Sequence, residues 1–246
     1  MDFYRDLSLL SETVPSKVRI CAIAAIFLLT FFALGLPLLI TPLSDLGEID
    51  EDCGLALSEQ SRRIFLQLHN KYRSRAAKGE YTIKNKWSKM KVLPPATRML
   101  QFKYNCSLER SALKYAYIAQ GKMIHSHWKG LGENLWAISV KITHERAAER
   151  ATKSWGDEIT NHGMGKLSDS NQKIGHATQI LWHSTRSVGC GIIYAKSGWT
   201  SVVCHYYPQG NFLYTNMYRA GETLSDCGKE GRSEVPHSRT GLCELF

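Results

Sequence analysis

Apolar residues recur at helical spacing in three stretches of the chain. The first stretch is 58–77, where Ser58 can cap the helix N-terminus, and the others are 104–122 and about 143–162. The apolar positions that define these faces are Ile64, Leu68 and Tyr72, then Leu108, Ala112, Tyr115 and Ala119, then Ala148, Ala151, Trp155 and Ile159. The spacing therefore predicts three amphipathic helices, and a short fourth helix is predicted from Gly175.

The hydrophobic period changes from 3.6 to 2 in the C-terminal third of the chain. Two alternating stretches, 188–195 and 199–207, flank the turn residues 196–198, which is typical of a β-hairpin. Residues 125–136 read as a glycine-broken loop that enters an extended segment, and the basic, proline-containing stretch 79–103 reads as a loop. The pattern predicts an α+β fold with a small, mainly antiparallel sheet.

An uncharged apolar run spans Ile20–Ile40. Lys17 and Arg19 precede it and an acidic stretch follows, so the residues after the run are expected on the far side of a membrane from the N-terminus. The run is long enough to span a bilayer and also fits a secretory signal peptide. We expect cleavage and secretion; the alternative is a type II membrane anchor, with membrane contact only through residues 20–40. Both alternatives make the downstream domain extracellular or lumenal.

Composition divides the chain into four parts. Residues 1–40 form the signal peptide or anchor, and 41–57 form a linker rich in Pro, Ser, Gly and acidic residues. Residues 58–215 hold the periodic elements and form the globular domain. Residues 216–246 form a cysteine-containing C-terminal extension.

Six cysteines follow the apolar run, and an even number in an extracellular segment indicates disulfides. They are Cys53, Cys106, Cys190, Cys204, Cys227 and Cys243. Because Cys190 and Cys204 lie on the two strands of the predicted hairpin, their pairing is the favoured one. The pairing of the other four is left open by the residues alone. The chain has no C-x-x-C, so neither a redox motif nor a zinc ribbon is indicated.

Positive charge is concentrated in one part of the chain. Residues 59–114 contain fourteen Lys or Arg and three acidic residues, whereas the whole chain carries a net charge of +9. A basic face can attract anionic membranes or glycans, although a solvated surface is the simpler explanation. No zinc finger, RNA-binding signature or alternation of aromatic and basic residues is present, so nucleic acid is not an expected partner.

Several catalytic motifs can be excluded. Residues 144–148, His-Glu-Arg-Ala-Ala, begin like the zinc-protease motif H-E-x-x-H but end in alanine, so they lack the second histidine ligand. The chain has no G-x-S-x-G nucleophile elbow. Its extracellular cysteines can all be paired, which leaves no free thiol for a cysteine protease.

Four polar residues stand at element starts or on apolar helices, where side chains tend to face inward: His125, Glu133, Glu158 and His176. Neutral imidazole is a good zinc ligand, and a nearby carboxylate sets its tautomer or carries an activated water. The four can therefore hold zinc or another divalent cation, with His125 and His176 as ligands, or form a ligand cleft. Taken singly, each is more simply explained as a helix cap or a satisfied core hydrogen bond.

The remaining histidines are weaker candidates. Positions 176 and 183 are about 10 Å apart along a helix axis, so His183 cannot share a metal with His176. His127 lies two residues after His125, and a spacing of two is weak support for a ligand pair. We expect His127, His162 and His183 to be surface or structural residues.

Four motifs in order resemble the CAP superfamily of cysteine-rich secretory proteins, venom allergens and plant pathogenesis-related proteins. They are His-Asn-Lys-Tyr-Arg at 69–73, Gly-Glu-Asn-Leu at 132–135, Gly-His-Ala-Thr-Gln at 175–179 running on to Gly-Cys-Gly at 189–191, and Cys-His-Tyr-Tyr-Pro-Gln-Gly-Asn at 204–211. Within the superfamily, the chain resembles the activation-associated secreted, or venom-allergen-like, proteins of parasitic nematodes. The resemblance covers about 53–243, so residues 58–215 are identified as a CAP domain.

This resemblance implies an α-β-α sandwich with a central cleft lined by two His and two Glu. Matched motif by motif, those residues are His125, Glu133, Glu158 and His176. Three positions depart from the family pattern: His205 stands where Asn or Gln is usual, the cysteine often found late in the second helix is missing near Gln120, and Ala177 stands where an aromatic residue is usual. The second departure leaves the pairing of Cys53 with Cys106 open.

The resemblance also implies what the protein binds, since family members are linked to zinc, to sterols or fatty acids, and to immune modulation. The first hypothesis is a secreted or surface-exposed protein that acts between parasite and host, binding small lipids or host proteins, with a His/Glu cleft that can hold a divalent metal. The alternative is a zinc-dependent hydrolase that uses the same four residues, with Glu133 or Glu158 as base. A third hypothesis is a structural surface-coat protein. Two nitrogen ligands are fewer than catalytic zinc usually has, so binding is favoured over catalysis.

Overall fold

A computed structural model describes residues 43–47, 49, 53–229 and 231–246 of the 246-residue chain. The chain divides into two compact units, 1–40 and 41–246, and only the second contains described residues. The apolar run at 20–40, whether cleaved or retained, lies outside them and stays a prediction, as do the four domain boundaries. No helix within the described residues is both long and apolar enough to cross a membrane.

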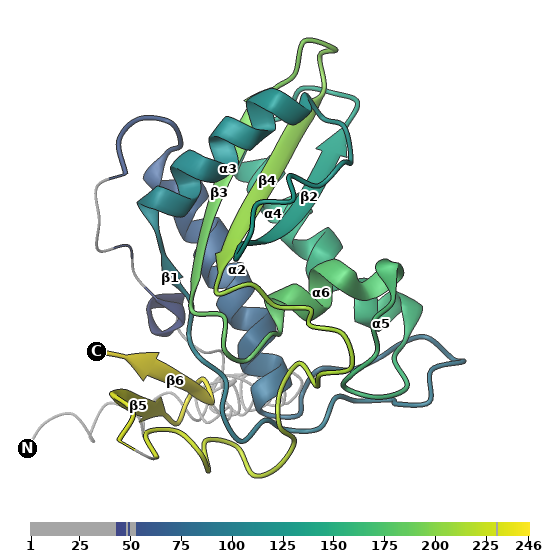
Figure 1. Ribbon diagram of the computed structural model, residues 1–246, viewed down its shortest axis with the longest axis vertical. Coiled ribbons are helices and arrows are strands. Elements are labelled where there is room, and N and C mark those ends of the chain that lie inside the picture. Colours follow the sequence, from purple (N-terminus) through teal and green to yellow (C-terminus); the bar gives the residue numbers. More distant parts are fainter. Residues whose placement is uncertain (1–42, 48, 50–52, 230) are drawn as a thin grey trace, which may run out of the picture. The chain divides into compact units, whose positions relative to one another are not determined.

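The described part has the mixed α+β architecture that the sequence predicts. In chain order its elements are η1 (Leu43–Leu46), α2 (Glu59–Ala77), β1 (Lys103–Tyr104), α3 (Cys106–Ala119), β2 (Gly132–Ile138), α4 (His144–Gly156), α5 (Glu158–His162), η2 (Gln172–Ile174), α6 (Gly175–Ile180), β3 (Ser187–Tyr194), β4 (Thr200–Tyr207), β5 (Glu234–His237) and β6 (Leu242–Leu245). The helices and strands lie as labelled in Figure 1.

Helix α2 begins where its sequence predicts. The hydroxyl oxygen of Ser58 accepts a hydrogen bond from the N–H of Ser61 at 3.1 Å, which satisfies one of the free donors of the first turn. The inner face of α2 buries Phe65, Leu66 and Tyr72 in the main hydrophobic core. The cap and the apolar stripe together account for this helix.

The same face of α2 also buries three polar side chains of the 69–73 motif, those of His69, Asn70 and Arg73. Arg73 has no exposed surface and its guanidinium donates only to backbone carbonyls, those of Leu100, Ile180, Trp182, His183 and Thr185. Asn70 donates to the carbonyls of Leu46 and Phe102 and accepts from the N–H of Phe102. These bonds attach α2 to segments far away in the sequence, so the motif is structural.

Four strands form the main sheet, in the order β1-β3-β4-β2. Strands β3 and β4 are the predicted antiparallel hairpin, with Gly198 in the turn at φ +83°, and β2 pairs antiparallel with the other side of β4. Strand β1 is parallel to β3. Because Cys190 lies directly opposite Cys204 in the hairpin, the expected disulfide joins them across the two strands.

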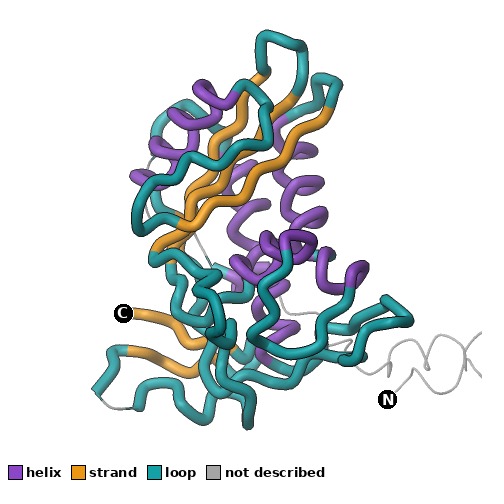
Figure 2. The backbone as a smooth tube through the Cα atoms, turned by 45° about the vertical axis from the view of Figure 1, so that its right-hand side comes forward, coloured by secondary structure: helices purple, strands orange, loops and turns teal. Residues whose placement is uncertain are grey.

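Helices cover both faces of this sheet, which makes three layers (Figures 1 and 2). Side chains from alternate strand positions pack on opposite faces. Leu135, Ile193 and Val203 form one cluster with α3, whereas Ile192 and Val202 join the larger core with α2 and α4. The structure therefore has the α-β-α sandwich architecture that the resemblance implies.

Glycines in β3 allow α3 to pack directly against the strand backbone. A Cβ atom at Gly189 would lie 2.3 Å from the backbone nitrogen of Glu109, and one at Gly191 would lie 2.4 Å from the Cα atom of Leu113. Both distances are far below contact, so any side chain here would push α3 away from the sheet. The Gly-Cys-Gly motif at 189–191 thus serves helix packing as well as the disulfide.

One helix prediction was wrong in detail. The helix expected over about 143–162 is broken into α4, which ends at Gly156, and the short α5, which begins at Glu158. At the break, the carbonyl of Gly156 accepts a hydrogen bond from the Tyr81 hydroxyl and Asp157 accepts one from the Tyr72 hydroxyl. Both tyrosines come from distant parts of the chain, so sequence periodicity cannot show these contacts.

The C-terminal extension contains a hairpin that the sequence analysis did not predict. Strands β5 and β6 pair antiparallel, and Arg98 holds β5 through hydrogen bonds from its guanidinium to both carboxylate oxygens of Glu234. A disulfide joins Cys227 to Cys243 in this extension, and another joins Cys53 to Cys106. All six cysteines that follow the apolar run are therefore paired. Cys53 and Cys106, whose pairing the family pattern left open, are joined to each other.

Candidate functional site

Glu158 and His176 form the first half of the candidate site. Glu158 is the first residue of α5 and His176 lies in the first turn of α6. Glu158 Oε1 lies 2.6 Å from His176 Nδ1. Glu158 Oε2 accepts hydrogen bonds from the backbone N–H groups of His176 and Ala177, at 3.0 Å each. Since a carboxylate only accepts, Nδ1 carries the proton, and in the neutral ring Nε2 keeps its lone pair.

Glu133 and His125 form the second half. Glu133 Oε1 lies 2.9 Å from His125 Nδ1 and also accepts the backbone N–H of Ser126 at 2.9 Å. The Glu133 side chain is 6 % exposed while that of His125 is 52 % exposed, so the ring extends from a buried carboxylate toward solvent. The tautomer is again set with hydrogen on Nδ1 and Nε2 available.

The two halves meet at one place. The ring centroids of His125 and His176 are 6.5 Å apart with an interplanar angle of 45°. Trp155 packs against His176 from the core side, with ring centroids 6.0 Å apart. Two imidazoles with open Nε2 atoms, each held by a carboxylate, therefore lie side by side at the surface.

Strand β2 connects the two halves through its alternating side chains. Glu133 holds His125, whereas the next residue, Asn134, donates from Nδ2 to the carbonyl of His176 at 3.2 Å and to the Tyr206 hydroxyl at 2.9 Å. Successive strand residues point to opposite faces. The Glu-Asn pair of the 132–135 motif thus supports both histidines from one edge strand.

His205 is a member of this site that the sequence analysis missed. It lies directly opposite Glu133 in the β2–β4 pairing, is fully buried, and its Nε2 donates to Glu133 Oε2 at 3.0 Å. Its Nδ1 lies 2.7 Å from the Ser111 hydroxyl, and Trp128 packs edge-on against its ring. The signal that could have found it is the strand register, which places position 205 across from position 133.

Three donors surround the carboxylate of Glu133. Burial acts to raise the pKa of this carboxyl, but hydrogen bonds from His125, His205 and Ser126 outweigh burial and hold the pKa well below its ordinary value. Glu133 is therefore a carboxylate at every physiological pH. It is better suited to orient His125 than to exchange protons.

The other histidines lie outside the pair. His127 is exposed, with a left-handed backbone at φ +56°, and His162 is exposed at the end of α5. His183 is half-buried beside Arg98, and burial together with Arg98 and Arg73 lowers its pKa to about 4. None of the three contacts His125 or His176 in the part of the chain that the structure describes.

The motif-bearing segment matches a known family. Residues 66–206 match the family model described as the cysteine-rich secretory protein family, CAP. The chain belongs to the CAP family. The four candidate residues and His205 all lie within the matched segment.

Named relatives of this CAP chain include a secreted protein. It is 30% identical over 215 residues to the Ancylostoma secreted protein of Ancylostoma caninum, which covers 81% of this chain and 48% of that protein. The crystal structure of Na-ASP-1 is similar, with a TM-score of 0.69, 29% identity and coverage of 80% of this chain and 50% of that one. The chain thus spans about half the length of these two relatives.

A second similar crystal structure contains a metal. The crystal structure of NaASP2 with Zn2+ has a TM-score of 0.66 and 31% identity, and covers 80% of this chain and 100% of that one. In the CAP chain described here, Cys227, Glu234 and Cys243 also bring potential ligand atoms together. Because those two cysteines are joined in a disulfide, they cannot act as thiolate ligands. The histidine pair is therefore the better metal candidate.

Proposed function

We propose that this chain is an extracellular interaction protein that holds a divalent cation, zinc or a similar ion, between His125 and His176. The observation that supports the proposal is that a carboxylate, buried at Glu133 and partly buried at Glu158, binds Nδ1 of each ring and leaves Nε2 as the ligand atom. This carboxylate–histidine arrangement is the usual second shell of zinc-binding histidines. The similar structure of NaASP2 with Zn2+, at 31% identity, also supports the proposal.

Binding is proposed as the main role of the site. Zinc in catalytic sites usually has three protein ligands and one open position, whereas this site offers two ring nitrogens, with Glu133 and Glu158 already engaged as acceptors. A bound zinc would supply Lewis acidity and lower the pKa of its water. The alternative proposal, a zinc-dependent hydrolase, predicts turnover of an ester or peptide substrate that stops when a chelator removes the metal.

Isothermal titration with zinc tests the metal proposal. We expect about one zinc per chain and loss of that binding in His125→Ala and in His176→Ala. His127→Ala is the matched control, because His127 is an exposed histidine two residues from His125 that lies outside the pair. Equal zinc binding in all four proteins would overturn the proposal.

The secreted role is proposed from the relatives and the sequence. One relative is named a secreted protein and others are named venom allergens, which supports secretion and, with it, binding of host proteins. The mass of the N-terminal peptide of protein recovered from the culture medium tests it. An N-terminal peptide that begins after residue 40 supports secretion. Recovery of the protein only in the membrane fraction, with residues 20–40 intact, supports an anchored surface-coat protein.

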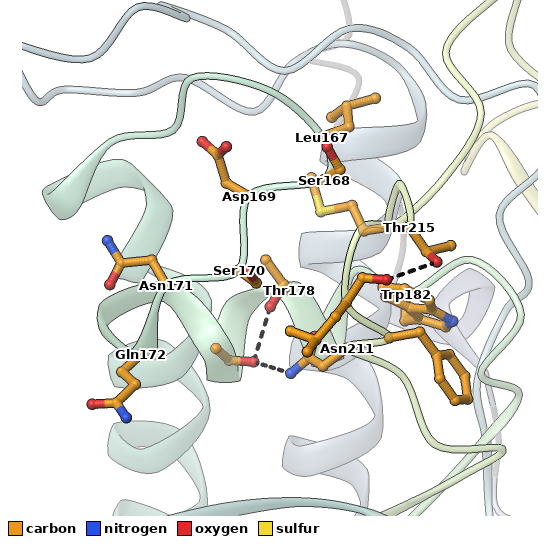
Figure 3. Close-up of a pocket in the computed structure, with 14 residues that line it drawn as sticks. Leu167, Ser168, Asp169, Ser170, Asn171, Gln172, Thr178, Trp182, Asn211 and Thr215 are labelled. Carbon is orange, nitrogen blue, oxygen red and sulfur yellow. Dashed lines mark hydrogen bonds between the residues drawn. The ribbon is translucent and has the colours of Figure 1, made fainter.

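A cavity beside α6 supports a second proposal, binding of a small lipid. The cavity has a volume of about 260 Å³ and apolar walls formed by Leu167, Trp182, Phe212, Leu213 and Met217. Figure 3 shows its polar rim, where the side chains of Asn211 and Thr178 bond to the carbonyl of Gly175. Ligand cavities usually measure about 300–1,000 Å³. Because this cavity is smaller than that range, a narrow fatty acyl chain fits it better than a bulkier sterol.

Titration with a fluorescent fatty acid tests the lipid proposal. Leu213→Asp places a charge in the cavity wall and is expected to weaken binding by about tenfold or more. Tyr214→Asp is the matched control, because Tyr214 is 94% exposed in the same loop and does not line the cavity. Equal binding by both variants and the parent protein would exclude this cavity as the lipid site.

A further inference from the structure

An open groove of about 540 Å³ lies between the loop at 84–91 and the segment that follows α5. Hydrogen bonds join its two walls. The side-chain amide of Asn85 donates to the carbonyl of Asn161 at 2.9 Å, and the Ser88 hydroxyl both donates to the carbonyl of Met164 and accepts its N–H, each at 2.9 Å. The groove is therefore held in shape by bonds between its walls.

Positive charge surrounds the groove. Lys89 and Lys166 line it, and the same loop carries Lys84, Lys86 and Lys91. Among the described residues, none of these five lysines forms an ion pair; the lysines that do are Lys78, Lys153 and Lys229. Lysines without an ion pair therefore lie along the groove and on the loop that forms one of its walls.

The one acidic residue in the lining, Asp169, is hydrogen-bonded to the backbone. Asp169 accepts the backbone N–H groups of Gly165 and Lys166 through Oδ2, at 2.6 and 3.1 Å. Its carboxylate shapes the turn that presents Lys166. It leaves the lysines of the groove available to an anionic ligand.

An exposed aromatic ring lies at the same groove. Trp87 is 82% exposed although it is a large apolar side chain, and the Nζ atom of Lys86 lies 4.9 Å from its ring centroid. Its backbone N–H donates to Asn85 Oδ1 at 2.8 Å, which positions the residue at the groove. The negative face of an aromatic ring attracts the polarised C–H groups of a sugar ring as well as cations.

We propose that this groove binds an anionic glycan, a polysaccharide that carries sulfate or carboxylate groups. A sugar ring stacks on Trp87, and the acidic groups pair with Lys89 and Lys166. Lysines around a concave surface focus the field on a bound anion. A polysaccharide chain can enter the concave, polar groove, whereas a flat anionic membrane would contact only the rim of the groove. The shape therefore favours a polysaccharide.

Titration of the full extracellular chain with a heparin-derived hexasaccharide, and with the same oligosaccharide after desulfation, tests this proposal. Both titrations use chelator-treated protein, so that the result does not depend on the histidine site. We expect Lys89→Gln/Lys166→Gln and Trp87→Ala each to raise the Kd for the sulfated oligosaccharide about tenfold or more. The desulfated form is expected to bind the parent protein more weakly.

Lys114→Gln/Lys122→Gln is the matched control, because it removes the same charge from exposed lysines of α3 and the loop after it. We expect less than a twofold change in its Kd. Equal weakening in both double variants would show unspecific attraction to a basic protein and overturn the proposal. The proposal would also be overturned if the sulfated oligosaccharide did not bind the parent protein. That includes the case in which phosphatidylserine vesicles bind instead, through Lys89 and Lys166. Unchanged melting temperatures of the variants show that each is folded.

Discussion

Glu158 holds His176 by its ring and by its backbone at once. Oε1 lies 2.6 Å from the ring Nδ1, and Oε2 accepts the backbone N–H of the same residue at 3.0 Å. The residue before α6 provides no side-chain cap, so Glu158 also satisfies the free N–H groups at the start of that helix. Capping and orientation of a potential ligand are therefore two consequences of one carboxylate.

The substitution Glu158→Gln is expected to weaken zinc binding 10- to 100-fold, as loss of a second-shell partner typically does. An amide has one oxygen and cannot accept from both the ring and the two backbone N–H groups. Zinc titration measures the effect, with Glu149→Gln as the control because Glu149 is an exposed glutamate of α4. If the two variants bind zinc equally well, Glu158 does not orient the ligand.

Replacing His205 is expected to disturb Glu133 and, through it, His125. His205→Ala leaves one oxygen of a buried carboxylate without its donor, which we expect to lower the free energy of unfolding by about 2 kcal/mol. His205→Gln keeps a donor at this position and is expected to recover part of both stability and zinc affinity. Urea unfolding and zinc titration measure the two effects; a His205→Ala protein identical to the parent in both would contradict the role.

The buried guanidinium of Arg73 is expected to tolerate no replacement. Arg73→Lys keeps the charge, but one ammonium group cannot reach the five carbonyls that the planar guanidinium bonds. We expect a loss of about 3 kcal/mol in the free energy of unfolding. Arg110→Lys on the exposed side of α3 is the control and is expected to change stability by less than about 0.5 kcal/mol.

Stability is expected to fall as the pH drops from about 6.5 to 4. Burial lowers the pKa of His69 to about 4, assisted by the charge of Arg73, although a hydrogen bond to Phe65 opposes the shift. Between the two pKa values the unfolded chain binds a proton at this residue and the folded chain does not, so acidification favours unfolding. A shift from 6.5 to about 4 corresponds to about 3 kcal/mol.

Urea unfolding at pH 7 and at pH 4 measures this loss. His69→Gln removes the titrating ring and is expected to reduce the difference between the two pH values, whereas His127→Gln, at an exposed position, is expected to leave it unchanged. His183 contributes in the same direction, because its pKa is also lowered to about 4. A pH difference that is the same in His69→Gln and in the parent would contradict this assignment.

Local patterns were sufficient to predict most of the regular structure. The cap at Ser58 and the apolar stripe of α2 operate within a few residues, and the period of two around Gly198 specifies a hairpin by itself. The pairing of Cys190 with Cys204 follows from that hairpin, because directly opposite residues of adjacent strands are within disulfide reach. Two of the four motifs contain Glu133 and His176, whereas His125 and Glu158 lie outside the motifs.

Interactions between distant segments decided the rest. At the break that follows Gly156, the hydroxyl groups of Tyr72 and Tyr81, which come from other parts of the chain, donate hydrogen bonds to Asp157 and Gly156. His205 joins the site only because β2 and β4 pair in the register that sets it opposite Glu133. A sequence determines which residues have helical or strand periodicity, since that is set by near neighbours. Which carboxylate meets which imidazole depends on how layers pack and strands register, and those distances exist only in the folded chain.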